Sequence, residues 1–149
     1  MCLRSAVALF LLVLTPATTV HSKGMQDPSE PLQPVATMSQ LMLDIIYPAS
    51  NDILLVIHRG GPSDNRDWAS LRRNAITLAE SGNLLMMRGR ARDQGDWMKY
   101  AKMLVDVGTA AYKAAQAQDT SALFSLSESL DSSCTTCHKQ YRPNVFPRP

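Results

Sequence analysis

The sequence predicts an all-α protein, folded as an antiparallel up-down-up-down four-helix bundle. Apolar residues recur at helical spacing in four stretches, the connections between the stretches are short, and no stretch alternates as a strand would. The 149 residues suffice for one compact domain, and 45% hydrophobic with 19% charged residues suits a globular protein. A formal charge of +2 gives no electrostatic reason to expect nucleic acid as a partner.

The first residues have the pattern of an export signal. Arg4 precedes an apolar run at 6–14, and Val20 and Ser22 place small residues where a signal peptidase reads them. The run is shorter than the ~20 residues that a membrane span needs. We therefore expect 1–22 to be a cleaved signal peptide, with no stable membrane anchor. Cys2 leaves with it, so Cys134 and Cys137 are the cysteines of the processed chain.

Residues 23–34 hold three prolines without an apolar period, which predicts a flexible leader. A first helix is expected over about 35–57. Pro48 lies inside it and lacks a backbone donor, so the helix should kink or split there. The apolar face of this helix consists of Met38, Leu41, Met42, Ile45, Ile46, Ile53 and Ile57.

Three further helices follow, and residues 35–142 together make the predicted bundle, with a tail at 143–149. The second starts near Asp64, and Gly82 weakens it without ending it. Its stripe is Trp68, Leu71, Ala75, Leu78, Ala79, Leu85 and Met86. The third helix carries Trp97, Ala101, Leu104, Gly108, Ala111 and Ala115. The fourth is capped by Asp119 or Thr120 and carries Leu123, Leu126, Leu130, Cys134 and Cys137. In the predicted topology, the two cysteines share one end of the bundle with the start of the first helix.

The segment "CTTCH", 134–138, carries the chemistry. Cys134 and Cys137 occupy neighbouring positions on one helical face, and His138 follows directly. This spacing is a haem-attachment signature, in which two thioether bonds hold the macrocycle and the histidine binds the iron. A closed zinc site needs about four ligands, and no second ligand pair is present. A redox dithiol favours a helix N-terminus, whereas this motif ends a helix, and a structural disulfide fits this spacing poorly.

Together with "TMSQLMLDIIYPAS" at 37–50 and "DWMKYAKML" at 96–104, the segment "CTTCHKQYR" resembles the class II c-type cytochromes, the cytochrome c-prime group and its six-coordinate relatives. The resemblance covers about 35–142. It implies one covalent haem c per chain, bound by Cys134 and Cys137, with His138 as the proximal iron ligand. Arg142 then either faces a haem propionate or the proximal pocket, or is a solvated cation.

The resemblance leaves the sixth iron position open. Some members present methionine from the first helix and carry electrons, and alignment of that helix favours Met42. Met38, one turn earlier, is the chief alternative, ahead of the methionines at 86, 87 and 98. Other members leave iron five-coordinate and bind nitric oxide or carbon monoxide. His58 lies 16 residues beyond Met42 and is too distant for bis-histidine ligation.

We therefore expect a periplasmic electron-transfer protein and not an enzyme, because no nucleophile–base pair is visible. The alternatives are a five-coordinate gas-binding protein and a haem-free helical module with a disulfide. A basic rim at the haem end either steers an acidic redox partner protein or is a set of solvated cations that neutralise the haem propionates. The rim consists of Arg88, Arg90, Arg92, Lys99, Lys139 and Arg142. The resemblance also admits a homodimer formed through paired helices.

Overall fold

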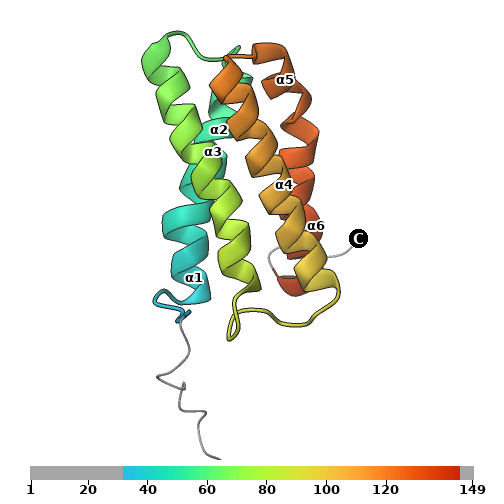
Figure 1. Cartoon of the computed structure of the whole chain (residues 1–149). Coiled ribbons are helices and arrows are strands. Elements are labelled where there is room, and N and C mark those ends of the chain that lie inside the picture. Colours follow the sequence, from blue (N-terminus) through green and yellow to red (C-terminus); the bar gives the residue numbers. More distant parts are fainter. Residues whose placement is uncertain (1–31, 145–149) are drawn as a thin grey trace, which may run out of the picture. The chain divides into compact units, whose positions relative to one another are not determined.

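The computed structural model describes residues 32–144, and every regular element in that range is a helix (Figure 1). The elements are α1 (Met38–Gln40), the π-helix η1 (Leu41–Ile46), α2 (Tyr47–His58), α3 (Asn65–Met86), α4 (Asp96–Ala117), α5 (Thr120–Ser125) and α6 (Ser127–Tyr141). The expected signal sequence, most of the leader and most of the tail lie outside the described residues. The all-helical class predicted from the sequence is confirmed for residues 32–144.

The first helix runs without a break from Met38 to His58, although it changes type along its length. Thr37 begins it with a capping box: its hydroxyl accepts from the Gln40 N–H, and the Gln40 side chain accepts from the Thr37 N–H. The π-helical turn of η1 follows, and the Tyr47 N–H bonds to the Met42 carbonyl, five residues back. Pro48 then falls in the first turn of α2, where its missing donor costs little.

Aspartates accept hydrogen bonds from backbone N–H groups at the starts of α3 and α4, although only α3 has an aspartate as its N-cap. Asp64 accepts from the backbone N–H groups of Arg66 and Asp67, which confirms the predicted start of α3. Before α4, Asp93 accepts from the N–H groups of Gly95 and Trp97. At the other end of α4, Gln118 takes a left-handed conformation with φ 52° and closes the helix.

The pair α3 and α4 approaches very closely, because two glycines face the contact. A Cβ on Gly108 would lie 2.5 Å from the Ala79 backbone nitrogen, and one on Gly82 would lie 2.7 Å from the Ala101 carbonyl oxygen. Gly82 does not end α3, as expected, and these distances give the reason for a glycine inside the helix. The two helices pack backbone against backbone along this stretch (Figure 1).

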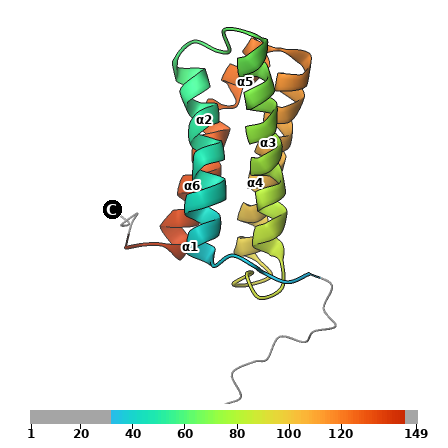
Figure 2. The same ribbon diagram turned by 90° about the vertical axis from the view of Figure 1, so that its left-hand side faces the viewer.

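The fourth predicted helix is divided into α5 and α6, a break that the sequence did not indicate. Asp119 caps α5 by accepting from the Ala122 N–H, as predicted. The two helices are separated by a 3₁₀-type turn at Leu126, whose N–H donates to the Leu123 carbonyl three residues back. The α6 helix then continues to Tyr141. It contacts both α4 and α2, and α2 stands in front of it in Figure 2.

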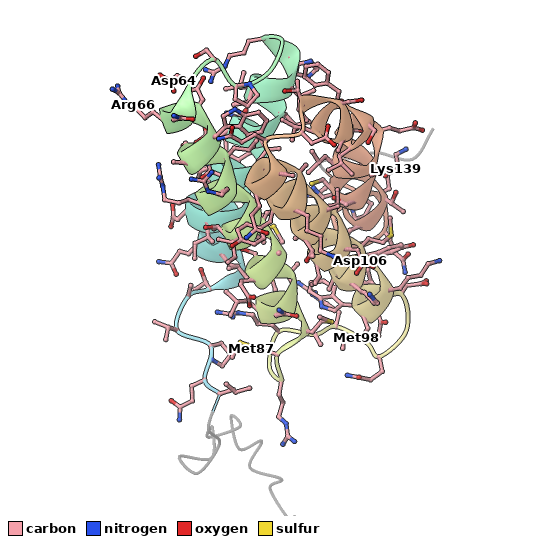
Figure 3. All side chains as sticks on the ribbon, turned by 45° about the horizontal axis from the view of Figure 1, so that its top comes forward. Asp64, Arg66, Met87, Met98, Asp106 and Lys139 are labelled. Carbon is pink, nitrogen blue, oxygen red and sulfur yellow. The ribbon has the colours of Figure 1, made fainter. Side chains whose placement is uncertain are left out.

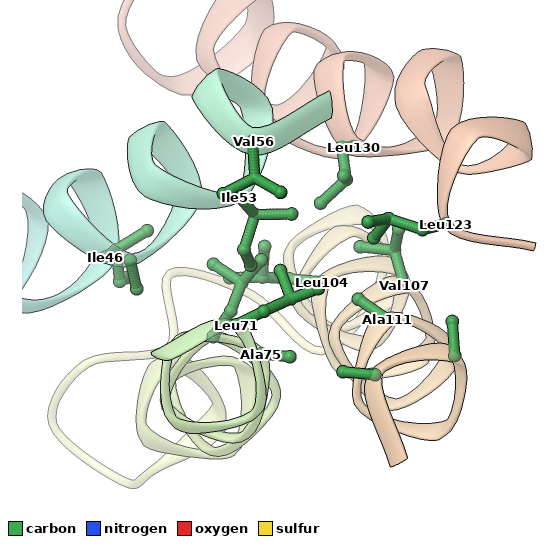
Figure 4. Close-up of a cluster of buried hydrophobic side chains, with 14 of the residues drawn as sticks. Ile46, Ile53, Val56, Leu71, Ala75, Leu104, Val107, Ala111, Leu123 and Leu130 are labelled. Atoms are coloured by element: carbon green, nitrogen blue, oxygen red, sulfur yellow. The ribbon is translucent and has the colours of Figure 1, made fainter. Parts of the chain in front are cut away.

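The core lies between these helices and is built from the predicted stripes. Figure 4 shows Ile53, Leu71, Leu104, Leu123 and Leu130 converging from α2, α3, α4, α5 and α6. All five are buried, and each contributes about 1.5–3 kcal/mol by leaving water.

The outer face of the first helix is also apolar. Leu43 and Tyr47 are each 62% exposed and Leu55 is 53% exposed. By length and composition, Met38–His58 could cross a membrane, a test that core helices and signal sequences of other proteins also pass. Its contacts with α3 and α6 give it the role of a packed helix in this fold.

Candidate functional site

One cavity is lined by most of the side chains that the sequence predicts to form the site. It measures about 310 Å³ and is lined from the first helix by Met38, Ser39 and Met42, and from α6 by Cys137, His138 and Tyr141. Trp97 of α4 contributes a further wall. The remaining lining residues are Arg92, Arg142 and Asn144, so part of the wall is polar and cationic.

A smaller chamber of about 40 Å³ adjoins this cavity and shares four of its residues, namely Met42, Trp97, Cys137 and His138. Its other walls are mainly apolar and come from η1, α3, α4 and α6. They consist of Ile46, Leu85, Tyr100, Ala101, Leu104, Ser133 and Cys134. The combined space is therefore apolar on one side and cationic on the other. An amphiphilic group with an apolar ring and carboxylates fits this division.

All six site residues predicted from the sequence line the two spaces: Met38, Met42, Cys134, Cys137, His138 and Arg142. Met86, Met87 and Met98 do not line either one. Figure 3 shows Met87 on the loop after α3 and Met98 near the start of α4. Met87 instead receives a hydrogen bond from Arg90 at its sulfur, 3.4 Å away. Of the five methionines that the sequence offers as iron ligands, only Met38 and Met42 on the first helix line these spaces.

The two cysteine thiols are protonated at neutral pH. Cys134 and Cys137 are free and half-buried on α6. Burial raises the pKa of both, that of Cys137 to about 11, so neither forms a thiolate at neutral pH. A redox dithiol centre needs a depressed thiol pKa, which makes these cysteines poorly suited to that chemistry. Among residues 32–144, no three histidines, cysteines or acidic residues lie close enough together to hold a metal ion between them.

The imidazole of His138 suits metal ligation. Burial, and then the charge of Arg142, lowers its pKa below the ordinary value. At neutral pH the ring is therefore uncharged and keeps a nitrogen lone pair for a metal. The Arg142 N–H bonds to the His138 carbonyl at 2.8 Å and closes the helix one turn after the ring. His58, by contrast, ends α2, and it lines neither cavity.

A set of side-chain contacts fixes the end of α6 against the start of α4. Tyr141 donates to Asp93, and its ring meets that of Trp97 edge-to-face at 5.0 Å. Gln140 accepts from the Tyr100 hydroxyl at 3.0 Å and donates to Asp96 at 3.3 Å. The turn of α6 that carries His138 is thus held from its C-terminal side.

The same contacts set the ionisation of Asp93 and Tyr141. The hydrogen bond from Tyr141, and then those from backbone N–H groups, lowers the pKa of Asp93. Burial, and then that bond, raises the pKa of Tyr141 to about 12. The pair is therefore a phenol donating to a carboxylate at neutral pH. The sequence did not indicate a role for Asp93, although an aspartate in a turn commonly accepts from the backbone N–H two residues further on.

Comparisons with protein-family models, with curated proteins and with solved structures found no match for this chain. Its function is therefore inferred from the geometry and chemistry of the site.

Proposed function

We propose that the chain is a periplasmic electron-transfer cytochrome of the class II c type, carrying one covalent haem c. The observation that carries the proposal is the meeting of Cys137, His138 and Met42 at one cavity, with Cys134 on the adjoining chamber. The two cysteines attach the haem, His138 is the proximal ligand, and Met42 is the distal ligand. When bound, the haem supplies a one-electron couple, and a thioether ligand raises its potential.

In this proposal the chain's own residues hold the site ready. His138 is neutral, which keeps a lone pair for the iron. Apolar walls such as Ile46 and Leu104 exclude water from the macrocycle. Arg92 and Arg142 offset the charge of the carboxylates at the cationic wall. Tyr141 and Asp93 keep the last turn of α6 in place.

We extend the proposal to topology. The bundle is antiparallel and runs up-down-up-down, with the first helix, α3, α4 and α5–α6 as its four members. Its support is a chain of contacts between helix ends. The Trp97 indole at the start of α4 donates to the Leu85 carbonyl at the end of α3, at 2.8 Å. Tyr141 at the end of α6 bonds to Asp93 just before α4.

The absorption spectrum of the full chain, expressed with haem-attachment machinery, tests the function. We expect a Soret band, low-spin features and a sulfur-to-iron charge-transfer band, and no covalent haem in a Cys134→Ser/Cys137→Ser variant. A high-spin ferric spectrum that changes on adding nitric oxide would instead favour the alternative function, a five-coordinate gas-binding protein. A wild-type protein without a Soret band would end the haem proposal and leave a helical module.

The expected acidic partner belongs to the same proposal, with one change to its docking surface. Arg90, expected in the basic rim, is 9% exposed and bonds to backbone carbonyls, so it cannot present its charge to a partner. The basic rim therefore consists of the five exposed cations, which are Arg88, Arg92, Lys99, Lys139 and Arg142.

A further inference from the structure

Arg90 joins three segments that meet at the cavity end of the fold. One terminal nitrogen donates to the Ala36 carbonyl at 3.1 Å, across 54 residues of sequence. The other donates to the Leu84 carbonyl and the Met87 sulfur, each at 3.4 Å. One guanidinium thus ties the residues before the first helix to the end of α3 and to the loop after it.

The burial of this side chain is energetically unusual. A guanidinium is expensive to remove from water unless it is paired and hydrogen-bonded. Arg90 is 9% exposed, yet within residues 32–144 no carboxylate pairs with it, and its Nε atom is buried without a hydrogen-bond partner. The planar guanidinium presents donors from separate nitrogens in a rigid fork, so it can reach carbonyls on two segments, whereas a lysine offers a single compact ammonium. The side chain therefore works as a clamp between segments and not as a surface charge.

The clamp acts where the first helix begins. Ala36 directly precedes Thr37, whose capping box starts the helix, and Met38 and Met42 follow within two turns. The loop backbone also approaches this segment: a Cβ on Gly89, which has φ +82°, would lie 3.7 Å from the Pro34 ring. The α-helical start of the first helix is short, because α1 has three residues and the π-helical turn follows at once.

We propose that Arg90 is a positioning residue, which fixes the start of the first helix and thereby holds Met38 and Met42 over the cavity. The positioning of the helix stands on the hydrogen bonds alone. Its consequence for iron ligation rests on the proposed function. Two measurements test these two claims separately. Amide hydrogen exchange reports the stability of the helix start with or without haem, and the absorption spectrum reports the iron ligand.

The test compares the wild type with Arg90→Lys and Arg90→Gln in the full chain, and uses Arg73→Gln as the matched control. Arg73 is an exposed arginine of α3 and lines neither the cavity nor the adjoining chamber. We expect the Leu41 amide, which bonds to the Thr37 carbonyl at 2.9 Å, to exchange at least about tenfold faster in both Arg90 variants, as loss of a charge-assisted hydrogen bond implies. Core amides of α3 should change much less, and Arg73→Gln should change neither.

In the haem-loaded protein, the low-spin fraction and the sulfur-to-iron band should fall in the Arg90 variants while the Soret band remains. Equal acceleration of the Leu41 amide and the α3 core amides would overturn the proposal, since Arg90 would then stabilise the whole fold. Unchanged Leu41 exchange would overturn it as well. If Arg90→Gln does not fold, Arg90→Lys decides. A wild type without a Soret band ends the proposed function, and the exchange result still decides the clamp.

Discussion

At the residue scale, the choice between Met38 and Met42 is the sharpest question about the site. Both line the larger cavity, but only Met42 also borders the apolar chamber beside Cys134. If the proposed haem is present, Met42→Ala should convert a low-spin spectrum to high-spin and lower the reduction potential, whereas Met38→Ala should leave the spectrum low-spin. Absorption and redox titration of both variants measure this. The opposite pattern would make Met38 the ligand, and two unchanged spectra would exclude methionine from the first helix.

A second residue-scale prediction concerns Asp67, far from the cavity. It accepts from the backbone N–H and hydroxyl of Ser63 at 2.9 and 2.8 Å and pairs with Arg59 at 2.8 Å. The backbone hydrogen bond from Ser63 is the first cause that lowers its pKa, and the charge of Arg59 also contributes. Because the folded-state pKa is depressed, its stabilisation is full above the unfolded value of about 3.9 and is lost as pH falls through the folded value.

We therefore predict that Asp67→Asn lowers the melting temperature at pH 7, and that its difference from the wild type shrinks as the pH drops below about 4. Thermal melts across pH measure this. Asp106→Asn is the control, since Asp106 makes an exposed i,i+4 pair with Lys102, worth about 0.5 kcal/mol or less. A difference for Asp67→Asn that persists unchanged at pH 2 would show that shape, and not charge, matters at this position.

The sequence predicted some of these residues and missed others for a physical reason. Cys134, Cys137 and His138 share one helical turn, so local spacing alone places them together. Arg90 and Asp93 act through partners 54 and 48 residues away, Ala36 and Tyr141. Such bonds depend on loop paths that periodicity does not encode. For this reason Arg90 was expected as a surface charge, although its side chain is buried.

At the element scale, the first helix shows how a short π-helical segment changes which residues lie on the buried face. Leu41 and Ile46 are both buried although they are five residues apart, a spacing that an α-helix would turn away from one face. The longer turn of η1 brings them together and lets Pro48 enter the first turn of α2. Proline in the sequence predicted an irregularity here, but not that the helix would stay continuous through a π-turn.

The closest element contact gives a prediction about Gly108. In an ordinary helix, glycine to alanine gains about 1 kcal/mol from propensity. A Cβ at Gly108, however, would lie 2.5 Å from the Ala79 nitrogen and 2.8 Å from its Cα, and backbone cannot move aside as a flexible side chain can. We predict that Gly108→Ala lowers the free energy of unfolding by about 1–3 kcal/mol, as overpacking does.

Urea unfolding of Gly108→Ala measures this, with Lys113→Ala as the control. Lys113 is an exposed residue of the same helix, where alanine is an ordinary helical residue. The control should change stability little. A Gly108→Ala protein as stable as the wild type would mean that α3 and α4 can separate slightly at no cost.

At the scale of the whole molecule, the predicted apolar stripes proved sufficient for the helical class, because each stripe found its place in one shared core. Leu71, Leu104 and Leu130, one from each of three predicted stripes, meet there (Figure 4). The break between α5 and α6 was not predictable, since Leu126 has neither a glycine nor a proline beside it. The predicted site residues line two adjoining cavities because the helices pack together, an arrangement that no single apolar stripe predicts.

The distribution of charge over the molecule gives the last prediction, which rests on the proposed electron transfer. Lys99 and Lys139 are exposed members of the basic rim, and each lies near Tyr100, on α4 and α6 respectively. If the rim steers an acidic partner, Lys99→Glu/Lys139→Glu should slow electron transfer by about tenfold or more at low ionic strength. Near 0.15 M salt, where the screening length is about 8 Å, most of the difference should vanish.

Arg66→Glu/Arg73→Glu on α3 is the control, because it makes the same change of net charge away from the basic rim. Arg66 lies at the end of the bundle opposite Met87 (Figure 3). Stopped-flow rates across salt concentrations compare the two variants, and equal slowing in both would mean that net charge, rather than the rim, attracts the partner.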